Sequence, residues 1–438
     1  MIFSLEVRRA RKGDCLLLHF GSKDDPGLII VDGGPKSVYK PHLKPRLEQI
    51  RIARGLSNQD SLPIDLLMVS HVDDDHIQGI LDLTKELVES QDAQKPQLVQ
   101  VLSFWHNSFD DIIGKRPEEL TAAFRSHFGA AATSGELPAD ATLEVDDESG
   151  ELTDEIVNDN LKVLASIEQG YRLRMDAEKL GFPRNPEFDG KLIIAKGKAE
   201  RLEIGRGLAF TLAGPMKSQV EALRKKHDEW LRRLNSEGES PAEALAAYLD
   251  KSIPNLSSLV LLAEADGKRM LLTGDARGDK IIEGLQFVGL LGADGDSTMH
   301  VDLLKVPHHG SSNNVERNFF ERITADHYVF SGNGEHGNPE REALEMLFHA
   351  RDGAEFKVHL TYPVAEIDEE RRRDWNKEQT KEKNKKKNNP AIKVRSNWSP
   401  KTQSLEAFFA NQRAPEARIS IVDPDAPHLV NLLDAVEF

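Results

Sequence analysis

The sequence has little cysteine and no long apolar run, and each shortage excludes a class of protein. One cysteine, Cys15, stands among 438 residues, so neither an intramolecular disulfide nor a thiolate-rich zinc site can form. No stretch approaches the roughly 18 uninterrupted apolar residues of a transmembrane helix. The N-terminus, MIFSLEVRRARKGD, carries basic residues where a signal peptide needs its apolar region. We therefore expect a cytoplasmic protein in a reducing compartment, without membrane insertion.

Positive charge is also in deficit. The chain has 57 Lys and Arg against 73 Asp and Glu, a formal net charge of −16. Because affinity for phosphate backbones comes largely from clustered lysine and arginine, this balance excludes a surface that binds nucleic acid or anionic membrane throughout. A local basic patch stays open. The apolar share of 39% and the length indicate a globular chain with a sizeable core.

Hydrophobic periodicity predicts alternating strands and helices. Apolar runs at Cys15–Phe20, Leu28–Val31 and Ile64–Ser70 predict strands, and ILDLTKELVES, which follows the third run, has helical spacing. The stretch NLSSLVLLAEADGKRMLLTGDA predicts a hairpin that turns at Asp266-Gly267, and VDLLKV predicts a buried strand. A further strand is predicted at Val329–Gly332. Helices are predicted at Leu43–Ala53, Lys217–Leu234, Pro241–Leu249 and Pro339–Ala350.

Two segments differ from this pattern. Residues 110–250 are predicted to be mostly helical and polar, and we interpret much of this range as an insertion; Glu144–Asp159 holds eight acids in sixteen positions. Residues 371–387 contain nine Lys or Arg and three acids. Both a solvated, mobile linker and a nucleic-acid-binding tract are open for this basic segment. The end of the chain, ARISIVDPDAPHLVNLLDAVEF, predicts a strand, a turn and then a strand or helix.

The densest group of potential metal ligands is HVDDDH at 71–76, between a predicted buried strand and a helix. A loop at the carboxyl end of a strand can direct several side chains into one cleft. His71 and Asp73, two apart on an extended segment, can point the same way, while Asp75 and His76 can face a second ion at the start of the helix. The alternative is an acidic loop that caps the helix N-terminus.

Two more predicted strands end in metal-binding residue types. The carboxylate of Asp275 has the two oxygens needed to bridge divalent ions about 3.5–4 Å apart. The alternative interpretation of Asp275 is an aspartate in a turn. The adjacent His308 and His309 point to different sides, so we expect one ligand and one proton carrier or substrate contact, in either order. Because three strand ends each deliver His or Asp, we predict a common metal site.

These stretches resemble metallo-β-lactamase-fold hydrolases and are most similar to the soluble hydrolase domain of the ComEC/Rec2 type. The matching stretches are Gly13-Asp14 with LLLHF, VDGG at 31–34, SHVDDDHIQGI at 70–80, NLSSLVLL at 255–262, LLTGDA at 271–276 and LKVPHHGSS at 304–312. The resemblance implies an α/β fold, a four-layer αββα sandwich with metals at the shared edge of two sheets. It implies a hydrolase domain over 1–350, with the insertion at 110–250 unmatched, and a C-terminal extension over 351–438 that contains the charged tract 371–388.

The resemblance also implies a ligand set. Carried over to this chain, it makes metal ligands of His71, Asp73, Asp75 and His76, with Asp275 as the bridging ligand and His308 or His309 as a further ligand. The wider superfamily has histidine at the place of Asp73, a departure that the ComEC-like branch shares. A hard oxygen at this position favours manganese more than an all-histidine site would, and zinc stays open. Two divalent metal ions, Zn or Mn, are implied as cofactors.

Four further positions are candidates near the site. His106 follows the strand-like QLVQVLSFW, where the superfamily places another ligand, and a structural or substrate-binding role is equally open. Asn338 stands where the ComEC-like pattern has a histidine before proline, and His336, two residues earlier, could replace it. Asp32 is expected to orient a ligand, its alternative being a turn carboxylate before Gly33-Gly34.

The donor set and the resemblance together predict a metal-dependent hydrolase, with a phosphodiester as the expected bond and a nuclease as one form of it. Bound cations would lower the pKa of a coordinated water, so that hydroxide forms at neutral pH. Asp75 or Asp275 would accept the proton of the water, and His309 or His308 would stabilise or protonate the leaving group. The alternatives are hydrolysis of a small non-nucleic ester (lactone, thioester or phosphocholine-type) and a partner-binding component of a bacterial multi-protein system with regulated hydrolysis.

Overall fold

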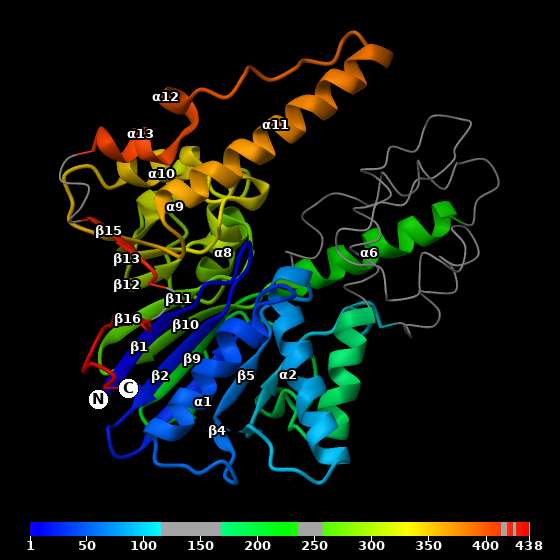
Figure 1. The fold of residues 1–438 in the computed structure, drawn as a ribbon, viewed down its shortest axis with the longest axis vertical. Helices are drawn as coiled ribbons and strands as arrows, with labels where there is room; N and C mark the ends of the chain where they lie inside the picture. Colours follow the sequence, from blue (N-terminus) through cyan, green and yellow to red (C-terminus); the bar gives the residue numbers. More distant parts are fainter. Residues whose placement is uncertain (115–167, 235–256, 413–417, 424–425, 438) are drawn as a thin grey trace.

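Two large β-sheets pack face to face in this chain, with helices on both outer sides (Figure 1). The computed structural model describes residues 1–114, 168–234, 257–412, 418–423 and 426–437. The first sheet has the strand order β16-β1-β2-β3-β5-β7, and the second has the order β15-β14-β13-β12-β11-β10-β9-β8. Both sheets mix antiparallel with parallel pairs. The predicted α/β class with two sheets is confirmed.

The strand bounds of the first sheet are β1 (Ile2–Val7), β2 (Leu16–Gly21), β3 (Pro26–Val31), β5 (Leu66–Met68), β7 (Phe104–Trp105) and β16 (His428–Asn431). A separate pair consists of β4 (Leu62–Ile64) and β6 (Val99–Val101). The second sheet contains β8 (Arg201–Gly205), β9 (Leu208–Gly214), β10 (Val260–Ala265), β11 (Lys268–Leu272), β12 (Met299–Lys305), β13 (Ile323–Phe330), β14 (Lys357–Leu360) and β15 (Ile419–Ile421).

Side-chain alternation along the strands explains the layers. In β2, Leu16 and Leu18 belong to the apolar core between the two sheets, whereas Leu17 belongs to the core under the helices. In β3, Ile29 faces the first of these cores and Ile30 the second. Both faces of the central strands are therefore buried, which requires helices outside the sheet.

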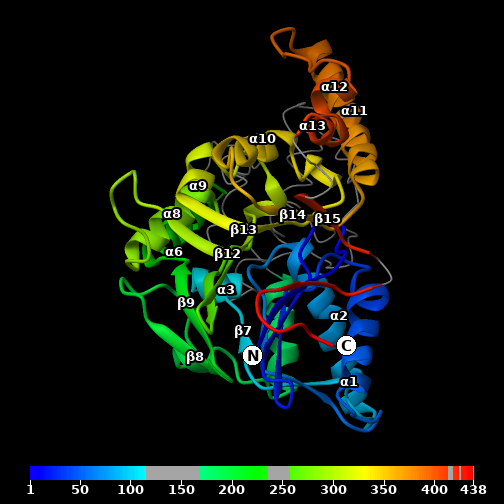
Figure 2. The same cartoon turned by 90° about the vertical axis from the view of Figure 1, so that its left-hand side faces the viewer.

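The helices form the outer layers, as Figure 2 shows for both sides. The first sheet is covered by α1 (Lys44–Ala53) and α2 (Asp74–Asp92), and the second by α8 (Gly278–Phe287), α9 (Arg317–Arg322) and α10 (Arg341–Ala350). The remaining labelled helices are α3 (Phe109–Ile113), α6 (Lys217–Leu234), α11 (Val364–Asn388), α12 (Pro400–Gln403) and α13 (Leu405–Ala410). None of the helices in the described ranges is long and apolar enough to span a membrane.

Most predicted elements are confirmed, including the hairpin that turns at Asp266-Gly267. Two interpretations need correction. Residues 201–214, within the range predicted to be mostly helical, form β8 and β9, and the basic tract lies in helix α11 and is not a linker. The acidic stretch 144–159 and the helix predicted at 241–249 lie outside the described residues. The boundary near residue 350 stays a prediction, although β14, β15 and β16 pair with the two sheets.

Candidate metal centre

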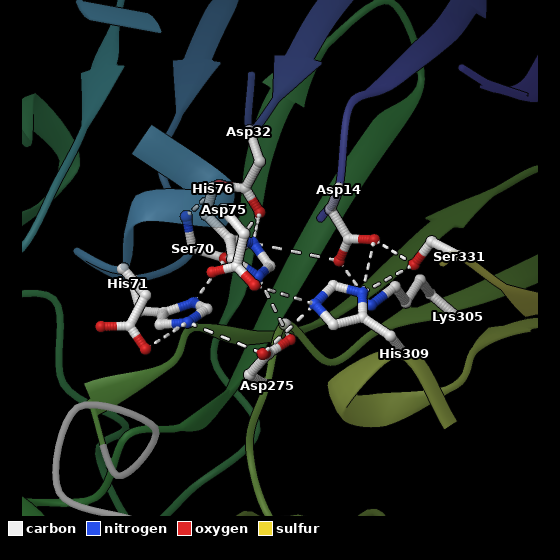
Figure 3. A network of polar contacts seen from close by, with 12 residues as sticks. Asp14, Asp32, Ser70, His71, Asp75, His76, Asp275, Lys305, His309 and Ser331 are labelled. Atoms are coloured by element: carbon white, nitrogen blue, oxygen red, sulfur yellow. Dashed lines mark hydrogen bonds and ion pairs between the residues drawn. The ribbon is translucent and has the colours of Figure 1, made fainter. Parts of the chain in front are cut away.

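The candidate site lies where strands of both sheets end (Figure 3). Asp32 follows β3, His71 lies in the loop between β5 and α2, and Asp275 follows β11. His308 and His309 follow β12, and all of these are carboxyl ends of strands. The packing of the two sheets therefore brings together side chains that are far apart in the sequence, as predicted for open α/β sheets.

Glycines allow these loops to approach helix α2 closely. A Cβ on Gly79 would lie 1.9 Å from the carbonyl oxygen of Gly33, and one on Gly13 would lie 1.8 Å from that of Asp75. Neither distance is possible for a real Cβ atom. Glycine at these places therefore lets the loops that carry Asp14 and Asp32 contact the start of α2.

Asp275 is the centre of the cluster, with four imidazoles around it. Its Oδ1 lies 3.3 Å from Nε2 of His76, and its Oδ2 lies 3.4 Å from Nε2 of His309. The Nε2 atoms of His71 and His308 are 3.9 and 3.8 Å from the same Oδ2. One carboxylate thus contacts four histidines, the arrangement that a bridging ligand would have.

Two further carboxylates lie beside the histidines that surround Asp275, one near His71 and one near His309. Asp73 Oδ2 lies 3.6 Å from His71 Nε2, and Asp75 Oδ2 lies 3.9 Å from His309 Nε2. All seven residues predicted as ligands from the three motifs are therefore brought together. Whether each one binds a metal stays a prediction.

The cluster is buried on one side and open on the other. His71, His76, Asp275 and His309 are buried, whereas the side chain of His308 is 29% exposed. Asp73 and Asp75 are also partly exposed, at 29% and 22% of their side chains. A substrate can therefore approach the site from the side of these three residues.

His76 is oriented by a carboxylate, as expected of Asp32. The Nδ1 of His76 lies 2.8 Å from Asp32 Oδ2, and the same oxygen accepts a hydrogen bond of 2.6 Å from Ser70 Oγ. Because a carboxylate oxygen accepts hydrogen bonds, Nδ1 of His76 is the donor. Nε2 of the same ring then faces Asp275.

Asp14, Lys305 and Ser331 belong to the site and were given no role from the sequence. Asp14 forms a buried ion pair with Lys305 and accepts a hydrogen bond from the Ser331 hydroxyl. That hydroxyl lies 3.0 Å from Nδ1 of His309, so its oxygen accepts a hydrogen bond from Nδ1, and Nε2 of the same ring faces Asp275. Asp14 was part of a matched stretch, but its partner Ser331 lies 317 residues away in the sequence, where no local signal could reveal it.

The unpaired atoms of the cluster fit a metal ion. Nε2 of His71, His76 and His309 and Oδ1 of Asp275 are buried without a hydrogen bond among the described residues, which is unusual for buried polar atoms. Metal bonds of about 2.1 Å in a tetrahedral site place ligand atoms about 3.4 Å apart. The contacts of 3.3 and 3.4 Å around Asp275 match this spacing. Asp14, His76, Asp275 and His309 also offer ligand atoms within 4.8 Å of one another.

The charges of the site favour a cation. Burial alone would raise the pKa of Asp275, but His309, His76 and His308 outweigh it and hold that pKa well below its ordinary value. Burial would lower the pKa of His309, yet Asp275 and Asp14 raise it to about 9. The carboxylates thus stay ionised and draw positive charge to the imidazoles, which a divalent ion would supply equally well.

The contacts of His106 are with residues outside this cluster. His106 is buried, donates a hydrogen bond of 3.3 Å to the carbonyl oxygen of Gly170 and stacks on Phe104 at 5.5 Å. Burial lowers its pKa to about 4, so it is a neutral core residue. His336 is exposed in a turn, and Asn338 is buried before Pro339. These contacts favour the structural alternative for His106, and its ligand role stays a prediction.

Comparisons with known proteins give weak likenesses. No protein-family model matches the chain. Microtubule-associated protein 1A is 28% identical over 183 residues in Rattus norvegicus, covering 41% of this chain and 6% of that protein. Its counterpart in Mus musculus is 30% identical over 153 residues, covering 33% and 5%. The chain therefore spans only about a twentieth of the length of these curated relatives.

Two solved structures are also similar. One is a Parabacteroides distasonis ATCC 8503 protein classed by name as a metal-dependent hydrolase, with a TM-score of 0.29, 8% identity and coverage of 82% of this chain and 98% of that one. The other is a motif variant of a metallo-β-lactamase from Cronobacter sakazakii, with a TM-score of 0.24, 12% identity and coverage of 69% and 75%. These values assign neither a family nor a function, and the likeness to ComEC/Rec2-type domains stays a prediction.

Proposed function

We propose that this chain is a metal-dependent hydrolase that holds two divalent cations and cleaves phosphodiesters. The observation that carries the proposal is Asp275 among four imidazoles, three of which direct an unpaired, buried Nε2 toward it. When bound, such ions lower the pKa of a coordinated water and offset the charge that gathers on the phosphoryl oxygens.

The geometry suggests how the ligands would divide. His71 and Asp73 would hold one ion, and Asp75, His76 and His309 the other, with Asp275 shared between them. Carboxylate and imidazole donors together suit zinc and manganese. The three carboxylates supply three negative charges against the four positive charges of two divalent ions, so the loaded site would keep a positive charge that attracts a substrate phosphate.

Residues on the open side have the chemistry that hydrolysis needs. Burial would raise the pKa of Asp75, but His76 and His309 lower it, so the carboxylate is ionised at neutral pH and can accept a proton from water. Burial lowers the pKa of His308, so its neutral ring can donate an N–H to a leaving oxygen. Both side chains are partly exposed and can touch a substrate.

Metal analysis combined with hydrolysis of bis-p-nitrophenyl phosphate tests the proposal. We expect about two ions per chain, and loss of metal together with at least a roughly 100-fold lower rate in Asp275→Asn, because a catalytic metal contributes several kcal/mol. Asp279→Asn is the matched control, since this aspartate lies four residues away and its side chain is 48% exposed. Fewer than one ion per chain, or equal rates in the two variants, would contradict the proposal.

The choice of substrate class is tested separately. The wild-type chain is assayed with bis-p-nitrophenyl phosphate, labelled single- and double-stranded DNA, a lactone, a thioester and a phosphocholine ester. Activity on the lactone or thioester, without activity on any phosphodiester, would replace the phosphodiesterase by the small-ester alternative. Bound metal without hydrolysis of any substrate would favour the partner-binding alternative.

A further inference from the structure

A long helix and the segment after it form an arm that extends away from the sheets (Figure 1). We call α11 and residues 389–399 the arm. The segment returns along the helix: Gln379 Nε2 donates to the Arg395 carbonyl oxygen at 3.0 Å, and Trp375 Nε1 donates to that of Ser396 at 2.8 Å. Arg395 also pairs with Glu382 at 2.8 Å. These contacts give the arm an internal order that does not depend on the sheets.

The base of the arm lies beside the loop that leaves the candidate site. A Cβ on Gly334 would lie 2.3 Å from the Ile367 carbonyl oxygen, so the loop touches the first turns of α11. Arg371, which is buried, donates to the carbonyl oxygens of Gly337 and Gln403 at 3.0 and 2.7 Å. Because this loop begins just after Ser331, the arm starts near the edge of the sheet that carries the metal centre.

Arginine and lysine side chains near the base of the arm form ion pairs with acidic residues of the same helix. Arg372 pairs with Glu369 at 2.8 Å, and Lys381 pairs with Glu378 at 2.7 Å. Arg373 also contacts Glu369, at 3.2 Å. These pairs neutralise the basal part of the tract, so its positive charge is not distributed evenly along the arm.

The far end of the arm differs, because residues 383–393 include five lysines and no acid. Lys383 and Lys387 donate to neutral amide oxygens, those of Gln379 and Asn384, at 2.7 and 3.0 Å. All five lysines are exposed, and four of them are Lys383, Lys386, Lys387 and Lys393. We call these four the lysine end. It concentrates positive charge on a chain whose net charge is −16.

We propose that the lysine end binds the phosphate backbone of a nucleic-acid strand. Exposed lysines attract phosphates as point charges without reading the base sequence, and their binding releases counterions. An anionic membrane fits less well, because helices that lie on membranes bury an apolar face, and residues 383–393 include one large apolar residue, Ile392, which is half-buried. Binding itself requires no hydrolysis; its pairing with a phosphodiester site rests on the proposed function.

Helix geometry gives the scale of the interaction. At 1.5 Å per residue, Lys383 lies roughly 30 Å along α11 from Val364, the length of about nine base pairs of duplex. A nucleic acid of about this length would contact the lysine end and the base of the arm together. The arm therefore favours polymeric over small phosphodiesters.

Salt-dependent fluorescence anisotropy with labelled 30-nucleotide DNA, single- and double-stranded, tests the proposal in the full chain. Asp275→Asn is used as the background so that the probe is not cleaved. The test variant changes the four residues of the lysine end to Gln. A control variant of equal net charge replaces four exposed lysines outside the arm with Gln, namely Lys95, Lys191, Lys196 and Lys198.

We expect the test variant to bind at least about tenfold more weakly, whereas the control stays close to the background. The slope of log affinity against log salt should become shallower by about 0.7 for each lysine that contacts a phosphate of the single strand. Equal affinities in the test and control variants would overturn the proposal. So would binding to phosphatidylserine vesicles that depends on the lysine end when DNA binding does not.

Hydrolysis separates this proposal from the proposed function. In the wild-type background, the test variant should hydrolyse bis-p-nitrophenyl phosphate at the unchanged rate, since the lysine end contributes no residue to the candidate site. DNA binding that depends on the lysine end, in a protein without any hydrolysis, would contradict the proposed function alone. Hydrolysis of the small ester without such DNA binding would contradict the role of the arm alone.

Discussion

His309 depends on a chain of hydrogen bonds that begins at a buried lysine. Lys305 pairs with Asp14, Asp14 accepts from Ser331, and the Ser331 oxygen accepts the Nδ1 proton of His309 at 3.0 Å. Asp32 and Ser70 hold His76 in a corresponding way. Two serine–aspartate pairs thus fix two imidazoles with both Nε2 atoms directed at Asp275, which prepares the site for a cation.

Substitution of Ser331 tests this arrangement. Ser331→Ala removes the acceptor of the His309 Nδ1 proton, so the ring loses its fixed orientation, and we expect metal affinity to fall by about 10–100-fold. Competition with a chromophoric chelator measures this affinity without relying on activity. Ser396→Ala, at an exposed serine of the arm, is the control. Equal affinities in the two variants would show that the hydrogen bond does not orient His309.

Single residues show where sequence reasoning succeeds and where it stops. The ligand types at 71–76, at Asp275 and at His308-His309 were predicted because each motif stands at the end of an apolar strand. No other Asp, Glu or His lies within four positions of Asp14 in the sequence, and Lys305 lies in a stretch predicted to be a buried apolar strand. Their roles depend on a contact between β12 and the loop after β1, which periodicity does not describe.

Among the elements, β1, β2 and α1 are joined by a buried ionic group. Glu6 on β1 lies 2.8 Å from Arg46 Nε on α1 and accepts a hydrogen bond of 3.0 Å from His19 on β2. Burial alone would raise the pKa of Glu6, but its bonds to His19 and Arg46 lower it to about 2. Burial lowers the pKa of His19, so Arg46 supplies the lasting counter-charge.

The stability of the chain should therefore depend on Glu6 and on pH. Because the folded pKa lies below the unfolded value, the stabilisation is complete above about pH 4.5 and is lost as pH falls toward 2. We expect Glu6→Gln to lower the free energy of unfolding at pH 7 by about 3 kcal/mol, and the difference from wild type to shrink toward pH 2. Urea unfolding followed by circular dichroism at several pH values measures this.

Glu203→Gln is the control for this prediction, since the Glu203 side chain is 66% exposed. A difference between Glu6→Gln and wild type that stays constant from pH 7 to pH 2.5 would contradict the assigned role, because it would not follow the titration of Glu6.

The basic tract shows why an element can be misjudged from charge alone. Its composition is typical of a solvated linker, yet ion pairs three or four residues apart, such as Arg372 with Glu369, stabilise a helix there. Contacts with the returning segment add to this, and they involve residues about 15–20 positions further on. Likewise β8 and β9 are strands because they extend the edge of the second sheet, beside β10.

At the scale of the whole molecule, two strands near the C-terminus add an edge strand to each of the two large sheets. β16 pairs with β1 from Ser4 opposite Asn431 to Val7 opposite His428, and β15 pairs with β14. The N-terminal amine also lies 2.8 Å from Asp434. The two ends of the chain therefore lie side by side, as Figure 1 shows, and the C-terminal strands occupy the edges of both sheets.

Deletion of residues 424–438 should destabilise the protein more than loss of its terminal ion pairs does. Without β16, the backbone groups of β1 become an unpaired sheet edge, so we expect a lower urea midpoint and aggregation in size-exclusion chromatography. The control is Asp434→Asn with Glu437→Gln, which removes contacts to Met1 and Lys23 but keeps the strand. A truncated chain as stable and monomeric as this control would contradict the prediction.

The sequence by itself determined the local features: the apolar strands, the amphipathic helices, and the His and Asp residues at three strand ends. Neighbouring residues decide these features, since periodicity and turn chemistry act over a few positions. Only the tertiary structure decided that Asp275 meets four histidines, that Asp14 and Ser331 orient His309, and that the lysines stand at the end of an arm. Such contacts join residues up to hundreds of positions apart, and the packing of two sheets on each other, not the local pattern, sets them.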